Sequence, residues 1–242
     1  MPANIFFSSI KNWDNKTWLS SLSYIQSFNK FLISNVKLSQ NSKIIDIGCG
    51  RGKILGNLAS KLKLKTKPLG IDLENHKDRD KRINFQKIDA MTFFKKNIKS
   101  FDLILIKQTI HFLSITEIKE LLNLCRNKLN RNGKIVILTL DPRHNQIPSF
   151  SLMSKKLKIS LKRDEKIIKL ISNLYPKKIK RYFTFNVKIS KKKYIRMVKK
   201  KYISTLLGLS LQKILKGVDE INLKYKKNLK FKDSLQCLII KE

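Results

Sequence analysis

The sequence is poor in several residue types that define particular protein classes. Its 242 residues include only five prolines and eight glycines, which excludes a collagen-like chain and a Pro/Gly-rich linker protein. No apolar run approaches the roughly 18 residues that a membrane-spanning helix needs. The first ten residues, MPANIFFSSI, lack a basic segment and hold only a short apolar stretch, so they make a poor signal peptide.

Cysteine is also scarce. Cys49, Cys125 and Cys237 are far apart in the sequence and form neither a CxxC pair nor a cluster with histidine. A disulfide framework and a zinc site are therefore both disfavoured, and we expect no metal. Such a cysteine content fits a reducing compartment, so we expect a cytoplasmic protein.

Acidic residues are few: 17, against 53 basic residues, which gives a net charge of +36. The charge suggests an anionic partner, and it is densest in residues 177–201. However, 44 of the basic residues are lysine and nine are arginine, whereas nucleic-acid sites favour the planar guanidinium group. Lys, Ile and Asn share AT-rich codons, so genome composition is an alternative explanation of the charge.

The hydrophobic pattern alternates between strands and helices. Up to residue 140 it predicts strands at 43–47, 68–73, 83–88, 101–106 and 134–140, and helices at 17–37, 53–64 and 116–129. Beyond that point it predicts helices at 150–173, 191–206 and 210–227, an edge strand at 181–189 and a last strand at 231–240. This order predicts an α/β protein with a doubly wound parallel sheet and a helical insertion before the last strand.

The most informative motif is the segment Asp46-Ile47-Gly48-Cys49-Gly50-Arg51-Gly52, between the first strand and the next helix. Such a turn needs residues without Cβ, so that the backbone can bend and a ligand can approach closely. The N-terminus of the following helix presents free N–H groups. Because position 53 is lysine, the pattern is DxGxGxG and differs from the GxGxxG of dinucleotide-binding proteins.

Together with the segments that follow it, this motif resembles the class I S-adenosylmethionine-dependent methyltransferases, and the resemblance covers most of the chain. The matching segments are Gly70-Ile71-Asp72-Leu73-Glu74, Asp89-Ala90-Met91, the strand and turn at 101–112, and the approach to the fifth strand at 129–137. The segment at 129–137 has Arg-Asn-Gly where the family usually has Pro-Gly-Gly. The resemblance implies a Rossmann-like, mostly parallel seven-stranded sheet, a helical cap inserted before the last strand, and S-adenosylmethionine as cofactor.

The resemblance also implies how the chain is organised. It predicts a single methyltransferase domain over residues 1–242. Within it we expect an N-terminal lid helix (1–40), a cofactor-binding core (41–141), a substrate cap with an edge strand (142–228) and the last strand (229–242).

The family's cofactor-binding residues can be transferred to matching positions. The resemblance implies that Gly48, Cys49 and Gly50 cradle the methionine half and that Asp46 organises the loop. It implies that Asp72 takes the ribose hydroxyls and that Asp89 lies beside the adenine. The cofactor-binding residues that we expect are Asp46, Gly48, Cys49, Gly50, Asp72, Leu73, Asp89, Ala90 and Lys107.

Methyl transfer from a sulfonium is an in-line displacement, so the enzyme mainly aligns the nucleophile and excludes water. A base is needed only where the acceptor loses a proton. His111, past the fourth strand, is the candidate catalytic base because histidine titrates near neutral pH, and a packing role is its alternative. The acceptor-binding residues that we expect are Trp18, Gln108, His111, Arg143 and His144.

Arg143 can bind a carboxylate or phosphate bidentately, and His144 is a second candidate base. The alternative for Arg143 is a solvated loop residue.

These features predict a methyltransferase for a small, anionic acceptor, because a helical insertion before the last strand tends to close over a pocket. Two alternatives remain open. The first is an RNA methyltransferase that uses the basic final third, against which stand the few arginines and the lack of an RNA-binding module. The second is a noncatalytic cofactor-binding protein that docks on a membrane or a partner, against which the intact motifs argue.

Overall fold

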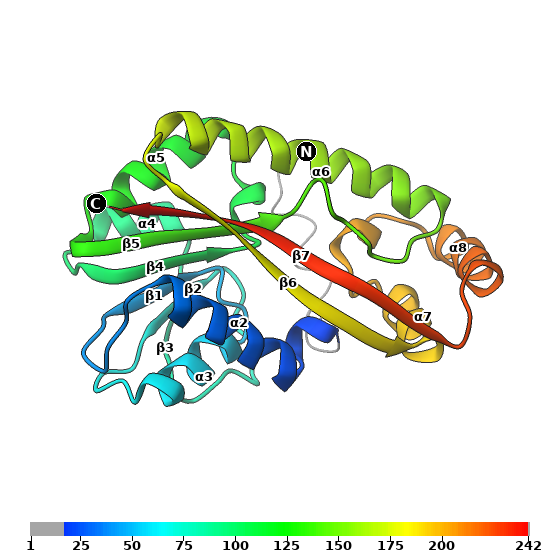
Figure 1. Cartoon of the computed structure of the whole chain (residues 1–242), viewed down its shortest axis with the longest axis horizontal. Helices are drawn as coiled ribbons and strands as arrows, with labels where there is room; N and C mark the ends of the chain where they lie inside the picture. The colour runs from blue at the N-terminus through cyan, green and yellow to red at the C-terminus, as the bar shows by residue number, and fades with distance from the viewer. Residues whose placement is uncertain (1–16, 242) are drawn as a thin grey trace. The chain divides into compact units, whose positions relative to one another are not determined.

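The computed structural model describes residues 17–241, and its centre is a seven-stranded sheet in the order β3-β2-β1-β4-β5-β7-β6, with helices on both faces (Figure 1). Strands β1 to β5 are parallel, and β7 is antiparallel to β5. This confirms the predicted mostly parallel sheet. The strands are β1 (Ile44–Ile47), β2 (Leu69–Asp72), β3 (Asn84–Lys87), β4 (Phe101–Lys107), β5 (Leu129–Leu140), β6 (Ile179–Ser190) and β7 (Asn228–Lys241).

The helices follow the predicted pattern with exceptions. The predicted helix at 17–37 is divided into a 3-10 helix (Trp18–Ser20) and a helix (Leu22–Asn35), and the short helix at Ile110–Phe112 was not predicted. Three further differences concern other helices. Helix α4 was not predicted; Asp89 begins it by accepting a 2.8 Å hydrogen bond from the amide of Thr92. Helix α5 begins at Ile115 because Ser114 and Glu117 form a capping box, so Thr116 does not begin it. The helices are η1 (Trp18–Ser20), α2 (Leu22–Asn35), α3 (Lys53–Leu62), α4 (Ala90–Lys96), η2 (Ile110–Phe112), α5 (Ile115–Arg126), α6 (Ser151–Leu174), α7 (Lys191–Lys199), η3 (Ser204–Leu206) and α8 (Leu211–Lys224).

The third difference is the end of α7, which stops at Lys199 although the pattern predicted a helix to residue 206. Lys201 has a φ of 53°, in the left-handed region that ends helices. The amide of Tyr202 then donates a 2.9 Å hydrogen bond to the carbonyl oxygen of Met197. The chain therefore turns into the short helix η3.

The chain divides into two compact units, each built from three segments. In the described part, unit 1 comprises residues 17–24, 141–165 and 184–234, and unit 2 comprises residues 25–140, 166–183 and 235–241. The single domain with its four consecutive parts stays a prediction. Residues 1–16 of the predicted lid lie outside the described residues.

Unit 2 contains the parallel strands, and alternate side chains of these strands face opposite helix layers. Ile45 and Ile47 of β1 and Ile104 and Ile106 of β4 join a buried cluster with α4, α5 and the second half of α6. Helix α2 covers the other face, where Lys107 lies with its Nζ 5.5 Å from the ring centroid of Phe28. Both faces of the sheet are therefore covered, as its continuous apolar strands require.

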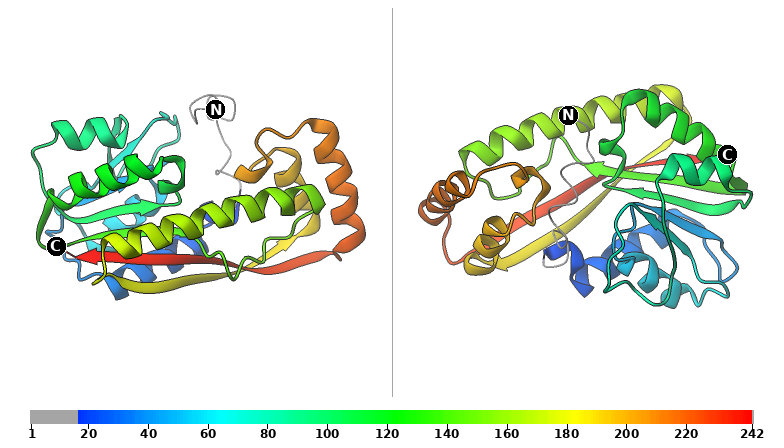
Figure 2. Two further views of the ribbon diagram at one scale, coloured as in Figure 1. Left: turned by 90° about the horizontal axis from the view of Figure 1, so that it is seen from above. Right: turned by 180° about the vertical axis from the view of Figure 1, so that it is seen from behind.

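Unit 1 contains α7 and α8, which lie between β6 and β7 in the sequence (Figure 2). This confirms the predicted insertion before the last strand. Trp18 packs edge-on against Phe231 at 5.0 Å between ring centroids, and its indole Nε1 donates a 2.9 Å hydrogen bond to Oδ2 of the buried Asp233. Tyr194 is also buried, and its hydroxyl donates to the carbonyl oxygen of Pro148.

Within residues 17–241, no helix combines the length and the hydropathy that crossing a membrane requires.

Candidate functional site

The glycine loop after β1 has a backbone that only glycine adopts readily. Gly48, Gly50 and Gly52 have φ angles of 72°, 53° and 66°. A Cβ atom on Gly48 would lie 2.2 Å from Oγ1 of Thr109, so there is no room for a side chain. The amides of Gly48 and Cys49 both donate to the carbonyl oxygen of Ile71, at 2.9 and 3.1 Å. These bonds fix the loop to β2.

Asp72, at the end of β2, makes the second link to this loop. Its Oδ2 accepts a 2.8 Å hydrogen bond from the amide of Gly50, and its Oδ1 accepts a 2.9 Å bond from the amide of Glu74. A carboxylate has about four lone-pair sites, so both oxygens retain the capacity to accept further hydrogen bonds.

Asp46 is a buried carboxyl group below the loop. It is 5% exposed, and its Oδ1 has no hydrogen-bond partner within the described part of the chain. Burial raises the pKa of Asp46 to about 7; the positive charge of Lys107 opposes this rise and the negative charge of Asp72 adds to it. Leaving a buried oxygen without a hydrogen bond costs free energy. The Oδ1 of Asp46 is therefore suited to accept a hydrogen bond from a ligand.

Lys107 ends β4 beside the loop. Its Nζ lies 2.9 Å from Oε1 of Gln108 and faces the ring of Phe28. Gln108 itself has a φ of 53°, so the chain turns sharply directly after the strand. This turn leads into η2, which carries His111.

Arg51 and Asp78 form an ion pair that the sequence analysis missed. Arg51 is 3% exposed, and its Nε lies 2.7 and 2.9 Å from the two carboxylate oxygens of Asp78. The carbonyl oxygen of Arg51 also accepts a 2.9 Å hydrogen bond from the amide of Asp80. Burial tends to raise the pKa of Asp78, but the hydrogen bond and charge of Arg51 hold it below its usual value. The pair fastens the loop after β2 to the glycine loop.

The remaining predicted cofactor residues lie along the same edge of the sheet. Leu73 follows Asp72 and is 51% exposed, and Ala90 is the first residue of α4. Asp89 is exposed, and its side chain already accepts a hydrogen bond as the cap of α4. Cys49 is half-buried, and burial together with Asp46 and Asp72 raises the pKa of its thiol. The thiol is therefore protonated at neutral pH.

This edge carries the carboxyl ends of the adjacent parallel strands β3, β2, β1 and β4. The strand order reverses between β1 and β4, and ligands of doubly wound sheets bind at such a point. The structure therefore brings together Asp46, the glycine loop, Asp72 and Lys107 at this edge.

The predicted acceptor residues are divided between the two units. Gln108 and His111 belong to unit 2, where the His111 ring centroid lies 4.1 Å from that of Phe112. Trp18, Arg143 and His144 belong to unit 1. Trp18 is 8% exposed, so most of its ring is buried in the core of that unit.

Arg143 and His144 both contact Asp141, whose side chain is 2% exposed. Oδ2 of Asp141 lies 2.8 Å from Nδ1 of His144, and Oδ1 accepts a 3.1 Å hydrogen bond from the amide of Arg143. The side chains of Arg143 and His144 are 59% and 65% exposed. Asp141 thus orients the imidazole while the rest of that ring remains accessible.

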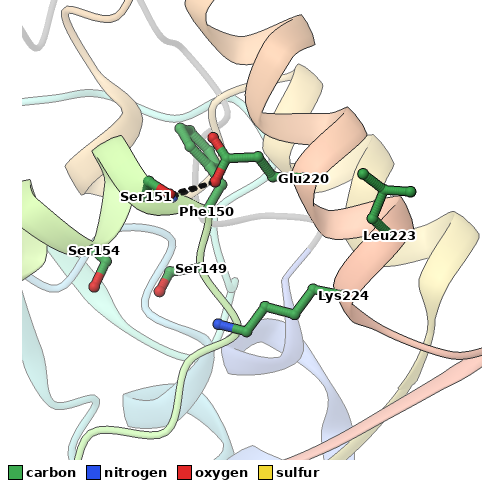
Figure 3. Close-up of a pocket in the computed structure, with 7 residues that line it drawn as sticks. All are labelled: Ser149, Phe150, Ser151, Ser154, Glu220, Leu223 and Lys224. Atoms are coloured by element: carbon green, nitrogen blue, oxygen red, sulfur yellow. Dashed lines mark hydrogen bonds between the residues drawn. The ribbon is translucent and has the colours of Figure 1, made fainter.

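A surface cavity of about 540 Å³ lies in unit 1 at the start of α6 (Figure 3). Oε2 of Glu220 accepts hydrogen bonds from the amide and hydroxyl of Ser151, at 2.8 and 2.6 Å. None of the predicted site residues lines this cavity. Its lining consists of Ser149, Phe150, Ser151, Ser154, Glu220, Leu223 and Lys224.

A family model described as a methyltransferase domain matches residues 45–135, which include the glycine loop, Asp72, Asp89 and Lys107. The chain contains a class I S-adenosylmethionine-dependent methyltransferase domain. S-adenosylmethionine is the cofactor of such a domain. In residues 17–241, no group of three or more His, Cys, Asp or Glu side chains is arranged to hold a metal ion.

Solved structures with the same fold include methyltransferases. The plantazolicin methyltransferase BpumL, in complex with a pentazolic desmethylPZN analog and SAH, is 19% identical with a TM-score of 0.53, covering 97% of this chain and 89% of that chain. A SAM-dependent methyltransferase from Archaeoglobus fulgidus is 21% identical with a TM-score of 0.53, covering 90% of this chain and 94% of that chain. At these identities the similarity shows the fold. Comparison with curated proteins gives no match.

Proposed function

We propose that the methyltransferase domain binds its cofactor at the carboxyl edge of β1 to β4 and transfers the methyl group to a small, anionic acceptor. The observation that carries the cofactor site is the hydrogen bond from the Gly50 amide to Asp72, which joins the loop after β1 to the end of β2. This bond places the glycine loop beside a carboxylate that can accept more hydrogen bonds.

The residues present fit S-adenosylmethionine, which supplies an electrophilic methyl group when bound. Gly48 and Gly50 hold the loop in its positive-φ conformation, with Cys49 between them. The space where Gly48 lacks a Cβ is filled by Thr109, so the lack of a side chain at Gly50 is what can admit a close ligand. The partnerless oxygen of Asp46 suits a donor such as an ammonium group.

In this proposal the other predicted residues take the remaining parts of the cofactor. Asp72 accepts hydrogen bonds from the ribose hydroxyls, and Leu73 contacts the nucleoside. Asp89 and Ala90 lie beside the adenine.

The acceptor roles of Gln108 and His111 in unit 2, and of Arg143 and His144 in unit 1, stay predictions for each unit by itself. An acceptor hydroxyl or ammonium must lose a proton, and His111 would take it; a carboxylate acceptor needs no base. Arg143 would bind an anionic group of the acceptor. Trp18 is retained as a predicted acceptor residue, although its indole N–H is already bonded to Asp233.

The small, anionic acceptor is supported by two features. Lysines are dense in residues 177–201, and Lys192, Lys193, Lys199 and Lys200 are exposed. In addition, the structural neighbour BpumL, a plantazolicin methyltransferase, is described in complex with a pentazolic desmethylPZN analog and SAH. We also retain the prediction of a cytoplasmic protein.

The test incubates the protein with labelled S-adenosylmethionine and a metabolite extract, with and without RNase. Label in a small molecule that anion-exchange resin retains supports the proposal. Label that RNase releases would identify an RNA methyltransferase instead. Calorimetry with S-adenosylhomocysteine tests the cofactor site separately, and no binding by the folded protein would overturn that part.

A further inference from the structure

Unit 1 contains a long stretch of sequence in which every charge is positive. Residues 184–218 include ten basic residues and no acidic residue. Helix α7 lies in this stretch, and all of its exposed side chains are basic. They are Lys192, Lys193, Arg196 and Lys199. A concentrated positive surface of this kind attracts an anionic partner.

The charge of α7 is densest at the end where it opposes helix stability. The helix begins with three consecutive lysines, Lys191, Lys192 and Lys193, and its first turn contains no acidic residue. The N-terminus of a helix carries a partial positive charge, so cations are unfavourable there and anions are favourable. A local arrangement that lowers stability is expected where function requires it. An anionic surface beside this turn would relieve the repulsion.

Lys191 joins the start of α7 to the end of α8, which packs beside it in unit 1 (Figure 2). Its Nζ donates hydrogen bonds to the carbonyl oxygens of Asn222 and Tyr225, at 3.3 and 3.2 Å. The end of α8 and the residues after it add three exposed lysines, which are Lys224, Lys226 and Lys227. Two groups of lysines that are distant in the sequence therefore lie at the same end of this helix pair.

Helix α8 adds exposed apolar side chains to these charges. Leu211, Leu215 and Leu223 are 64%, 42% and 90% exposed. They are separated by multiples of four positions, so they follow one exposed side of the helix, while the opposite side is buried. Leu223 is adjacent in sequence to Asn222, which Lys191 contacts. The row of leucines therefore reaches the lysines.

Lysines beside exposed leucines fit the surface of an anionic lipid bilayer. Lipid phosphates attract lysine ammonium groups, and leucine side chains enter the boundary between headgroups and acyl chains. A single-stranded nucleic acid would instead use aromatic side chains on which its bases stack. No aromatic side chain is exposed in the part of unit 1 that the structure describes. We infer that α7 and α8 dock unit 1 on a membrane that contains anionic phospholipid, independently of the proposed cofactor and acceptor sites.

The experiment measures co-sedimentation of the full-length protein with vesicles of phosphatidylcholine alone, or of phosphatidylcholine and phosphatidylglycerol in equal parts. We expect binding to the anionic vesicles only, and weaker binding at high salt. Lys192→Gln combined with Lys193→Gln should lower the partition coefficient by about tenfold to thirtyfold, because each lysine near the lipid contributes about fivefold. Lys61→Gln combined with Lys119→Gln removes the same charge from exposed positions of unit 2 and should have little effect.

The leucine row has its own variants. Leu223→Ser should lower the partition coefficient by about tenfold, because it removes an apolar side chain that enters the bilayer. Ile98→Ser is the matched control, since Ile98 of unit 2 is also 90% exposed. Asp219→Asn should strengthen binding, because Asp219 is an exposed negative charge between Leu215 and Leu223.

Thermal unfolding without vesicles shows whether the variants are folded. The double lysine variant should be at least as stable as the unmodified protein, because it removes positive charge from a helix N-terminus. Its weaker binding then has no explanation in a loss of folding.

The inference is wrong if the unmodified protein binds both kinds of vesicle equally or binds neither. It is also wrong if the control pair of lysines loses as much binding as Lys192→Gln with Lys193→Gln, since the charge of the whole chain would then be the cause. Binding of single-stranded RNA in place of vesicles, lost in the double lysine variant, would assign the surface to a nucleic acid. Binding of S-adenosylhomocysteine tests the cofactor site separately from all of these results.

Discussion

The amide of Gly50 donates a 2.8 Å hydrogen bond to Oδ2 of Asp72, across the carboxyl ends of β1 and β2. One carboxylate thus shapes the glycine loop and, in our proposal, binds the ribose. Asp72→Ala should lower the affinity for S-adenosylhomocysteine by about tenfold to a hundredfold, because it removes a charged acceptor. Asp72→Asn keeps one acceptor oxygen and should lose less. Unchanged calorimetric affinity in a folded Asp72→Ala protein would remove Asp72 from the site.

The close approach of Gly48 and Thr109 predicts a stability effect. Gly48→Ala should lower the free energy of unfolding by about 1–3 kcal/mol, because the new Cβ meets Oγ1 of Thr109 and φ is positive. Combining it with Thr109→Gly should relieve the contact but leave the backbone strain. Urea unfolding measures both steps. Equal stability of Gly48→Ala and the unmodified protein would contradict this account.

The raised pKa of Asp46, about 7, predicts how cofactor binding depends on pH. An ammonium group beside Asp46 favours its ionised form, so binding below pH 7 releases a proton. The affinity for S-adenosylhomocysteine should rise between pH 5 and pH 7, by at most about tenfold per pH unit, and level off above. Calorimetry across this range measures the rise, and Asp46→Asn should remove it. A flat profile in the unmodified protein would refute the prediction.

Asp164 on α6 is 1% exposed, its Oδ1 has no partner in residues 17–241, and burial raises its pKa to about 7. The folded state therefore favours the protonated carboxyl group. Its contribution to stability is full below about pH 4 and is lost as the pH rises through 7.

Asp164→Asn should therefore stabilise the protein at pH 8, by about 1–3 kcal/mol, and by less at pH 5. Thermal unfolding at the two pH values measures the difference. The exposed neighbour Glu165 provides the control, since Glu165→Gln should have little effect at either pH. A gain that is equal at both pH values would show that ionisation of Asp164 is not its cause.

His111 tests the chemistry of the acceptor. If His111 accepts a proton, His111→Ala should lower turnover by about 10²–10⁴-fold while binding of S-adenosylhomocysteine stays near normal. Initial rates with the acceptor found in the extract assay measure this. Near-normal turnover would instead assign His111 a packing role against Phe112 and would fit a carboxylate acceptor.

The local patterns of this sequence predicted most of the sheet and the glycine loop, because apolar strands and backbone turns depend on neighbouring residues. The pattern could not reveal the Arg51–Asp78 pair, since 27 positions separate its members and folding brings them together. The end of α7 also escaped prediction, because Lys201 adopts a left-handed conformation without the glycine that usually signals it. Likewise, the missing partner of Asp46 becomes visible only once the register of β1 and β4 is known.

The division into two units bears on how this protein can be cut or recombined. The chain passes between the units five times, within α2, α6, β6 and β7 and directly after β5. A single proteolytic cut therefore cannot release either unit as one continuous fragment. For the same reason, grafting unit 1 from a relative would require three separate segments, with four of the five junctions inside helices or strands.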